Sequence, residues 1–136
     1  MIYSNLDDNF FLLDYSPSHK QLLLRSKKNR ERNYNIDIII KGTLNILLPT
    51  NIKGVEIFVY NPDNDSKFIK DYKFISSKDY SIFAIKTYDK MCFFINGMCL
   101  GVYHNKLDIL ESSIGRYDYN DLDERIIWFC TNTKTS

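Results

Sequence analysis

The sequence predicts a mainly β fold: a single domain built as an antiparallel sandwich or partly open barrel, with at most one or two short helices. Ile, Tyr and Phe, which suit a pleated and half-buried surface, are abundant, whereas Ala, the strongest helix former, occurs once. Polar breaks recur about every ten residues, a spacing typical of sandwiches and barrels. The length of 136 residues is ordinary for one domain, so we expect residues 1–136 to fold together.

The first two strands are expected at residues 10–15 and 21–25, which are apolar runs on either side of a turn. The turn covers residues 16–19, because Pro17 fixes its own φ and biases Ser16 toward extended geometry. A charged loop follows at residues 26–33.

The clearest alternation runs from Ile36 to Leu48, where the even positions form one apolar face. A single strand of this length is uncommon. Gly42 therefore marks a bend, a bulge or a tight break between two strands, and Pro49 ends the run. Further strands are expected at residues 55–60, after a turn at Lys53-Gly54, and at residues 72–75 and 81–88.

A hairpin is predicted at Met91–Tyr103, where Asn96-Gly97 separates two apolar runs. Asn-Gly suits a two-residue type I′ turn, because both central residues need a positive φ. The register would pair Ile95 with Met98, Phe94 with Cys99 and Phe93 with Leu100. Both faces of this hairpin are apolar, so we expect it to be buried on both sides.

The C-terminal part is expected to contain a strand or a short helix at residues 107–114 and an acidic loop or single helical turn at residues 118–124. The last strand is placed at Arg125–Cys130, and residues 131–136 form a frayed tail.

No catalytic, metal or cofactor site is expected. The three cysteines are odd in number, lack repeat spacing and lie in apolar strands, so we interpret them as buried reduced thiols. His19 and His104 have no partners at metal-ligand spacing, and no nucleotide-binding or hydrolase motif is present. The sequence therefore predicts a protein that is not an enzyme.

The chain is expected to be cytoplasmic and to have no contact with a membrane. Its first residues lack the basic start and apolar stretch of a signal peptide, and no apolar run is long enough to span a bilayer. The net charge of +1 argues against a protein that binds nucleic acid over its whole surface. The oligomeric state is not predicted.

Two charged segments are candidate binding sites. The first is a basic stretch, interpreted as a solvated loop or as a contact to phosphates, with Arg25, Lys27, Lys28, Arg30 and Arg32. The second combines acids with tyrosines, which give a large contact area at low entropy cost, and is interpreted as a solvated connector or as a recognition loop for a basic protein. Its candidate contacts are Tyr117, Asp118, Tyr119, Asp121, Asp123 and Glu124.

Two resemblances follow from these residues. The β-rich composition, near-neutral charge, acidic-tyrosine segment and the stretches 14–26 and 35–42 resemble small bacterial immunity proteins. That resemblance implies a protein that binds and neutralises a cognate toxin by occluding its active site. Residues 94–101 are similar to a hairpin of concanavalin-like jelly rolls. The alternatives are a β-sandwich that binds carbohydrate or another small ligand, and a nucleic-acid contact through residues 25–32.

Overall fold

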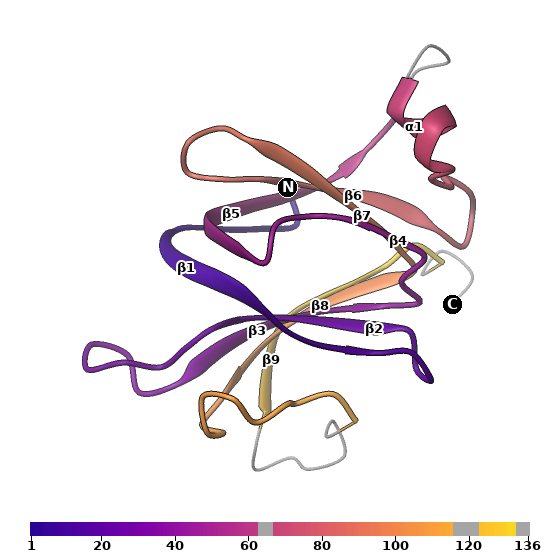
Figure 1. The fold of residues 1–136 in the computed structure, drawn as a ribbon. Helices are drawn as coiled ribbons and strands as arrows, with labels where there is room; N and C mark the ends of the chain where they lie inside the picture. The colour runs from indigo at the N-terminus through magenta and orange to yellow at the C-terminus, as the bar shows by residue number, and fades with distance from the viewer. Residues whose placement is uncertain (63–66, 116–122, 133–136) are drawn as a thin grey trace.

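The mainly β class is confirmed by the computed structural model, which describes residues 1–62, 67–115 and 123–132 (Figure 1). The described elements, in chain order, are β1 (Tyr3–Ser16), β2 (Gln21–Ser26), β3 (Asn35–Lys41), β4 (Asn45–Leu47), β5 (Asn51–Tyr60), α1 (Lys67–Tyr72), β6 (Ser81–Lys86), β7 (Cys92–Gly97), β8 (Cys99–Asn105) and β9 (Asp123–Cys130).

The described strands form one antiparallel sheet in the order β4-β7-β6-β5-β1-β2-β3-β8-β9, which is curled but not closed. Strand β1 joins its two halves, because its first part pairs with β5 and its last part pairs with β2. The ladder between β1 and β5 is interrupted between Asn5 and Asn9. Figure 1 shows β1 crossing between the upper strands and the lower strands.

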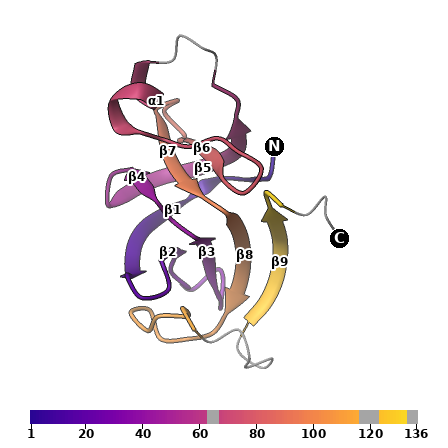
Figure 2. The same ribbon diagram turned by 90° about the vertical axis from the view of Figure 1, so that its right-hand side faces the viewer.

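A corner carries two segments of the chain from one half of the sheet to the other. β3 pairs with β8 and β4 pairs with β7, so the segment 35–47 lies along the segment 92–105 throughout. Both segments bend at the same place, Gly42 on one and Met98 on the other (Figure 2). Gly42 has φ +66°, and a Cβ there would lie 2.6 Å from Met98 Cγ. The predicted break at Gly42 is therefore confirmed.

The predicted Asn96-Gly97 hairpin is wrong, because β7 and β8 pair with other strands and form a bent continuation of each other. Asn96 is fully buried, and its amide binds the backbone of Ile75 and the carbonyl of Ser81. A Cβ at Gly97 would lie 2.5 Å from Ile40 Cγ2. Asn96 therefore bonds to the backbone of Ile75 and Ser81, and Gly97 allows the close approach of Ile40, so the dipeptide does not form a turn.

The main core lies inside the curl and takes side chains from both halves of the sheet. Its members include the even positions of β3 as predicted, and they are Phe10, Leu22, Leu24, Ile36, Ile38, Ile40, Ile52, Val55, Ile57, Phe83, Ile85, Ile95, Leu100 and Val102. Beyond the corner the alternation no longer predicts which side chains are buried, because Ile46, on the predicted apolar face, is 39% exposed. The apolar alternation continues through the bend at Gly42, but beyond the bend its apolar positions no longer all face the core.

Three local predictions are also wrong. Lys53 and Gly54 lie inside β5 and do not form a turn. The segment 72–75 is not a strand, since α1 ends at Tyr72 and the backbone of Ile75 binds the Asn96 side chain instead of a strand. Residues 107–114 are neither strand nor helix and form an irregular loop over the sheet.

The interpretation of the cysteines as buried reduced thiols is wrong as well. Cys99 and Cys130 are register partners on β8 and β9 and form a disulfide, while Cys92 is a free and exposed cysteine. Sequence spacing could not show this pair, because the two residues are 31 positions apart and only the order of the strands brings them together.

Candidate functional site

A buried ion pair lies on the outer face of the sheet, on the side away from the main core. Arg25 of β2 and Asp37 of β3 are register partners, and both side chains are fully buried. Arg25 Nε donates to Asp37 Oδ1 at 2.6 Å, and Nη2 donates to Oδ2 at 2.8 Å. Such a two-pronged contact is the strongest geometry for an Arg–carboxylate pair.

This pair is bonded to the irregular loop 106–115. Arg25 Nη1 donates to the carbonyls of Asp108 and Ile109, each at 3.0 Å. Ser113 Oγ donates to Asp37 Oδ2 at 2.6 Å. A buried charge is tolerated when its remaining hydrogen-bonding capacity is used, and the loop supplies those partners.

A small second core holds the same loop against the sheet. Leu23, Ile39 and Tyr103 form its buried centre, and Ile114 of the loop packs on them. Asn35 Nδ2 donates to the carbonyl of Leu107 at 2.9 Å. The loop is therefore fixed by both apolar and polar contacts, although it has no regular secondary structure.

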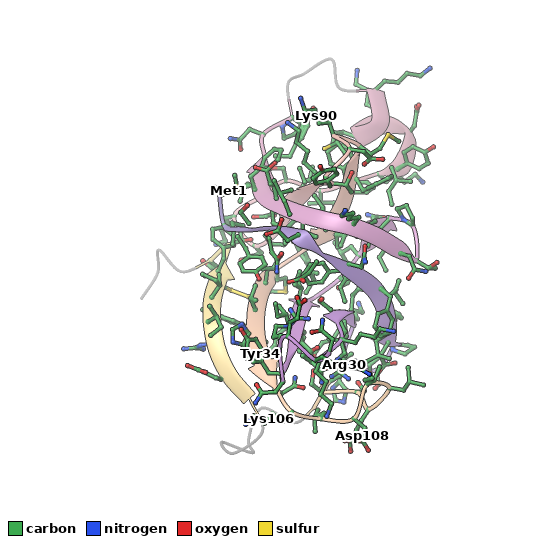
Figure 3. All side chains as sticks on the ribbon, turned by 90° about the vertical axis from the view of Figure 1, so that its left-hand side faces the viewer. Met1, Arg30, Tyr34, Lys90, Lys106 and Asp108 are labelled. Carbon is green, nitrogen blue, oxygen red and sulfur yellow. A yellow bond between two sulfur atoms is a disulfide. The ribbon has the colours of Figure 1, made fainter. Side chains whose placement is uncertain are left out.

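The tip of this clamped loop is apolar and exposed. Leu110 is 77% exposed and Ile109 is 38% exposed. Figure 3 shows Lys106 and Asp108 of the loop at the end of the molecule that also carries Arg30 and Tyr34, with Lys90 toward the opposite end.

A groove of about 590 Å³ adjoins the tip. Its lining consists of one segment from each of two paired strands, together with the loop tip and one lysine, namely Asn9–Phe11, Asn51–Lys53, Ile109, Leu110 and Lys27. The strand segments are register partners, since Asn9 pairs with Lys53 and Phe11 with Asn51. Lysines from two parts of the chain thus border an apolar floor.

The groove continues into a smaller pocket of about 250 Å³ that shares Asn51, Ile52 and Lys53. Exposed apolar surface continues here, with Tyr88 at 60% and Met91 at 53%. The Lys53 ammonium lies 4.6 Å from the centre of the Tyr88 ring, a cation–π distance. Together the two pockets form what we call the basic groove.

The five basic residues of the predicted patch do not share one surface. Arg25 is fully buried, which corrects its placement in a surface patch. Arg32 forms an ion pair with Asp8, and the Lys28 ammonium donates to the carbonyl of Lys106. Lys27 lines the basic groove, and Arg30 is exposed. Strand pairing turned Arg25 inward, which its position in a charged run could not show.

The acidic-tyrosine segment is largely outside the described residues, and this holds for Tyr117, Asp118, Tyr119 and Asp121. Asp123 begins β9, and Glu124 is an exposed residue of that strand. Sequence reasoning missed Ile109, Leu110 and Lys53. The signal for the first two is the apolar pair between Asp108 and Glu111, which lies in the segment 107–114 that the sequence predicts to be a strand or a short helix.

Within the described part of the chain, no group of three or more His, Cys, Asp or Glu residues is arranged to hold a metal ion. No helix found there has the length and apolar character that crossing a bilayer requires. No family model, curated protein or solved structure matches the chain.

Proposed function

We propose that the protein is a non-enzymatic protein-binding domain, and that it acts as an immunity protein that neutralises a cognate toxin by occluding its active site. The observation that carries this proposal is an exposed apolar loop tip, Leu110, held beside the basic groove by the buried Arg25–Asp37 pair. The resemblance of the sequence to small bacterial immunity proteins supports the choice of partner.

The clamped loop supports tight binding for an entropic reason. Ordering a mobile loop at an interface costs about 0.5–1.5 kcal/mol for each immobilised side chain, and a loop that is already fixed avoids much of that cost. Binding energy concentrates in a few apolar or aromatic residues that are surrounded by a polar rim. Leu110, Tyr88 and Met91 with the flanking Lys27 and Lys53 have that composition.

The charges of the basic groove indicate which part of a partner it meets. Lys27 and Lys53 favour acidic side chains on the facing surface, since complementary charges speed association and fix the register of a complex. We propose that residues 117–124 meet a basic region of the same toxin. The two segments would then contact regions of opposite charge on one partner.

We place the protein in the cytoplasm. Cys99 and Cys130 form a disulfide in the structure, and cytoplasmic reductants would open it to two neighbouring thiols on β8 and β9. Blocking thiols during cell lysis and weighing the intact chain tests this placement. Three blocked cysteines are expected, whereas a single blocked cysteine, Cys92, would argue for an oxidising compartment.

The functional test is inhibition of the toxin encoded beside this gene. We expect wild-type protein to bind and inhibit it, and Leu110→Asp to weaken binding by at least about tenfold, because a central apolar contact is replaced by a charge. Ile75→Asp is the matched control, since Ile75 is an exposed apolar residue beyond the end of α1 and lines neither pocket of the groove. A toxin that is neither bound nor inhibited, or equal binding by both variants, would overturn the proposal.

A further inference from the structure

A second concave site, separate from the basic groove, lies where the curled sheet stays open. It has a volume of about 640 Å³ and lies between the first part of β1 and residues of the β2–β3 connection, β3, β8 and β9. We call it the seam pocket, and its polar and aromatic lining includes Tyr3, Asn5, Asp8, Arg32, Tyr34 and His104. Its volume is within the range of small-molecule sites.

The seam pocket exists because β1 leaves its ladder at this point. Asn5 Oδ1 accepts hydrogen bonds from the amides of Asp7 and Asp8, at 3.3 and 3.2 Å. This side-chain turn satisfies backbone groups that would otherwise bond to β5, whose register with β1 is interrupted between Asn5 and Asn9. The turn carries the Asp8 carboxylate toward Arg32.

One wall of the seam pocket is aromatic and apolar. The rings of Tyr34 and His104 are stacked, with 4.3 Å between their centres and an angle of 26° between their planes. The Arg32 guanidinium lies 5.6 Å from the centre of the Tyr34 ring. Ile36 and Ile126 extend this wall. Because His104 stacks on the Tyr34 ring and Ile36 is buried, the apolar surface open to a ring-shaped ligand comes mainly from Ile126 and from the edges of the stacked rings.

The polar groups of the pocket are held in place by each other. Asp8 Oδ2 accepts from Asn5 Nδ2 at 2.9 Å and from Arg32 Nη1 at 3.1 Å. Arg32 Nη2 donates to Ser26 and to the carbonyl of Lys27, whereas its Nε is buried and has no partner among the described residues. The guanidinium therefore keeps one donor unused beside a fixed carboxylate.

The seam pocket has little net charge, so it favours neither an anionic nor a cationic ligand. Burial lowers the pKa of His104 and raises the pKa of Tyr3, so both rings are neutral near pH 7. Asp8 balances the charge of Arg32, and Asp7 adds a carboxylate that disfavours phosphate. Carboxylate, amide, imidazole and phenol groups together both donate and accept hydrogen bonds.

We propose that the seam pocket binds one ring of a neutral sugar. A sugar hydroxyl both donates and accepts, which matches the Asp8 carboxylate and the Tyr3 phenol, whereas the Asn5 amide is used by Asp7, Asp8 and Tyr3 and holds these groups in position. The C–H face of the ring would lie against the apolar and aromatic wall that includes Tyr34 and Ile126. The site shares no lining residue with the basic groove, so it is independent of the proposed toxin contact.

The test is an NMR titration of the wild-type protein with glucose, galactose, N-acetylglucosamine and inorganic phosphate. We expect at least one sugar to shift the amide resonances of residues 3–8, 34 and 104 in a saturable way. Phosphate should leave them unchanged. Absence of a response to all three sugars, or a saturable response to phosphate at these residues, would overturn the proposal.

Three variants locate the site and separate it from the groove. Asp8→Asn keeps the size of the side chain and should weaken sugar binding about tenfold, because a hydrogen bond to a charged acceptor is lost. Asp71→Asn, an exposed change on α1, and Leu110→Asp should bind as the wild type does. Equal affinity of Asp8→Asn and Asp71→Asn would place the sugar elsewhere and contradict the proposal.

Discussion

Two Arg–Asp pairs in this chain have the same chemistry and opposite surroundings. Arg25 and Asp37 are fully buried, contact each other through two hydrogen bonds and bind the loop 106–115. The side chains of Arg32 and Asp8 are 12% and 34% exposed, are joined by one bond of 3.1 Å and border an open pocket. The first pair fixes a surface, and the second lines a site.

The two pairs differ in how many of their remaining hydrogen-bonding groups find partners inside the protein. Asp37 accepts from Arg25, Asn105 and Ser113, so its charge is fully used inside the protein. Arg32 retains a buried Nε without a partner among the described residues. A satisfied buried pair has nothing left to offer a ligand, whereas the 34% exposed carboxylate of Asp8 at the pocket wall can still accept a hydrogen bond.

The largest effect is expected from breaking the buried pair. Arg25→Met should lower the free energy of unfolding by about 3–5 kcal/mol, because it leaves the Asp37 carboxylate buried without its cation. Arg32→Met is the matched control and should cost less, about 1–2 kcal/mol, because its bonds to Asp8, Ser26 and Lys27 are lost while the 34% exposed Asp8 carboxylate stays in contact with water. Urea denaturation measures both. Equal losses would mean that the two pairs do not differ as their burial indicates.

A double replacement separates the stability of the buried pair from its role as a clamp. Arg25→Met with Asp37→Leu should recover part of the stability lost by Arg25→Met alone, since no unpaired charge remains but the buried donors of Asn105 and Ser113 lose their acceptor. The carbonyls of Asp108 and Ile109 would still lack their donor, so amides of residues 106–115 should exchange with solvent faster than in the wild type. Unchanged exchange in this loop would show that apolar packing alone holds it.

The sequence allowed the fold class and the bend at Gly42 to be predicted, because both rest on local patterns of burial and backbone freedom. The partners of strands could not be predicted from local patterns. Asn96-Gly97 has the composition of a hairpin turn, yet β7 and β8 pair with four other strands, and Asn96 serves as a buried clamp. The Cys99–Cys130 contact depends on the same long-range order.

The candidate sites show the same limit. Arg25 belongs to a charged run in the sequence, but its register opposite Asp37 places it inside. Leu110 is apolar, but the clamp below it keeps it at the surface. In both cases the residue type predicts the opposite burial, and the actual burial is set by contacts between segments that are distant in the sequence. Lys27 is the one member of the predicted basic patch that lines the groove.

A smaller effect is expected on the pH dependence of stability, through His104 in the seam pocket beside Arg32 and Asp8. Burial lowers the pKa of His104, with Glu124 raising it and Arg32 lowering it further, so the folded state favours the neutral ring. Stability from this group is complete above the ordinary pKa of about 6.5 and is lost as the pH falls through the lower folded value. His104→Gln should flatten this part of the stability profile. The exposed His19→Gln should leave it unchanged, and an identical effect of both changes would contradict the assignment.

The smallest effect on stability is expected for Asp8→Asn, which keeps the shape of the side chain and removes the charge that Arg32 contacts. We expect a change within about 1 kcal/mol in the free energy of unfolding, measured by urea denaturation. A loss as large as that of Arg25→Met would show that the seam is a structural element rather than an open site.

The most direct test of the central claim is a hydrogen-exchange footprint of the protein bound to its toxin. We predict that protection on binding falls on residues 106–111 and on the strand segments that line the basic groove, around residues 9–11 and 51–53. Exchange at β4 and α1 should stay the same in the free and bound protein. Protection confined to β4 and α1, with the loop tip unchanged, would contradict the claim that the clamped loop forms the binding surface.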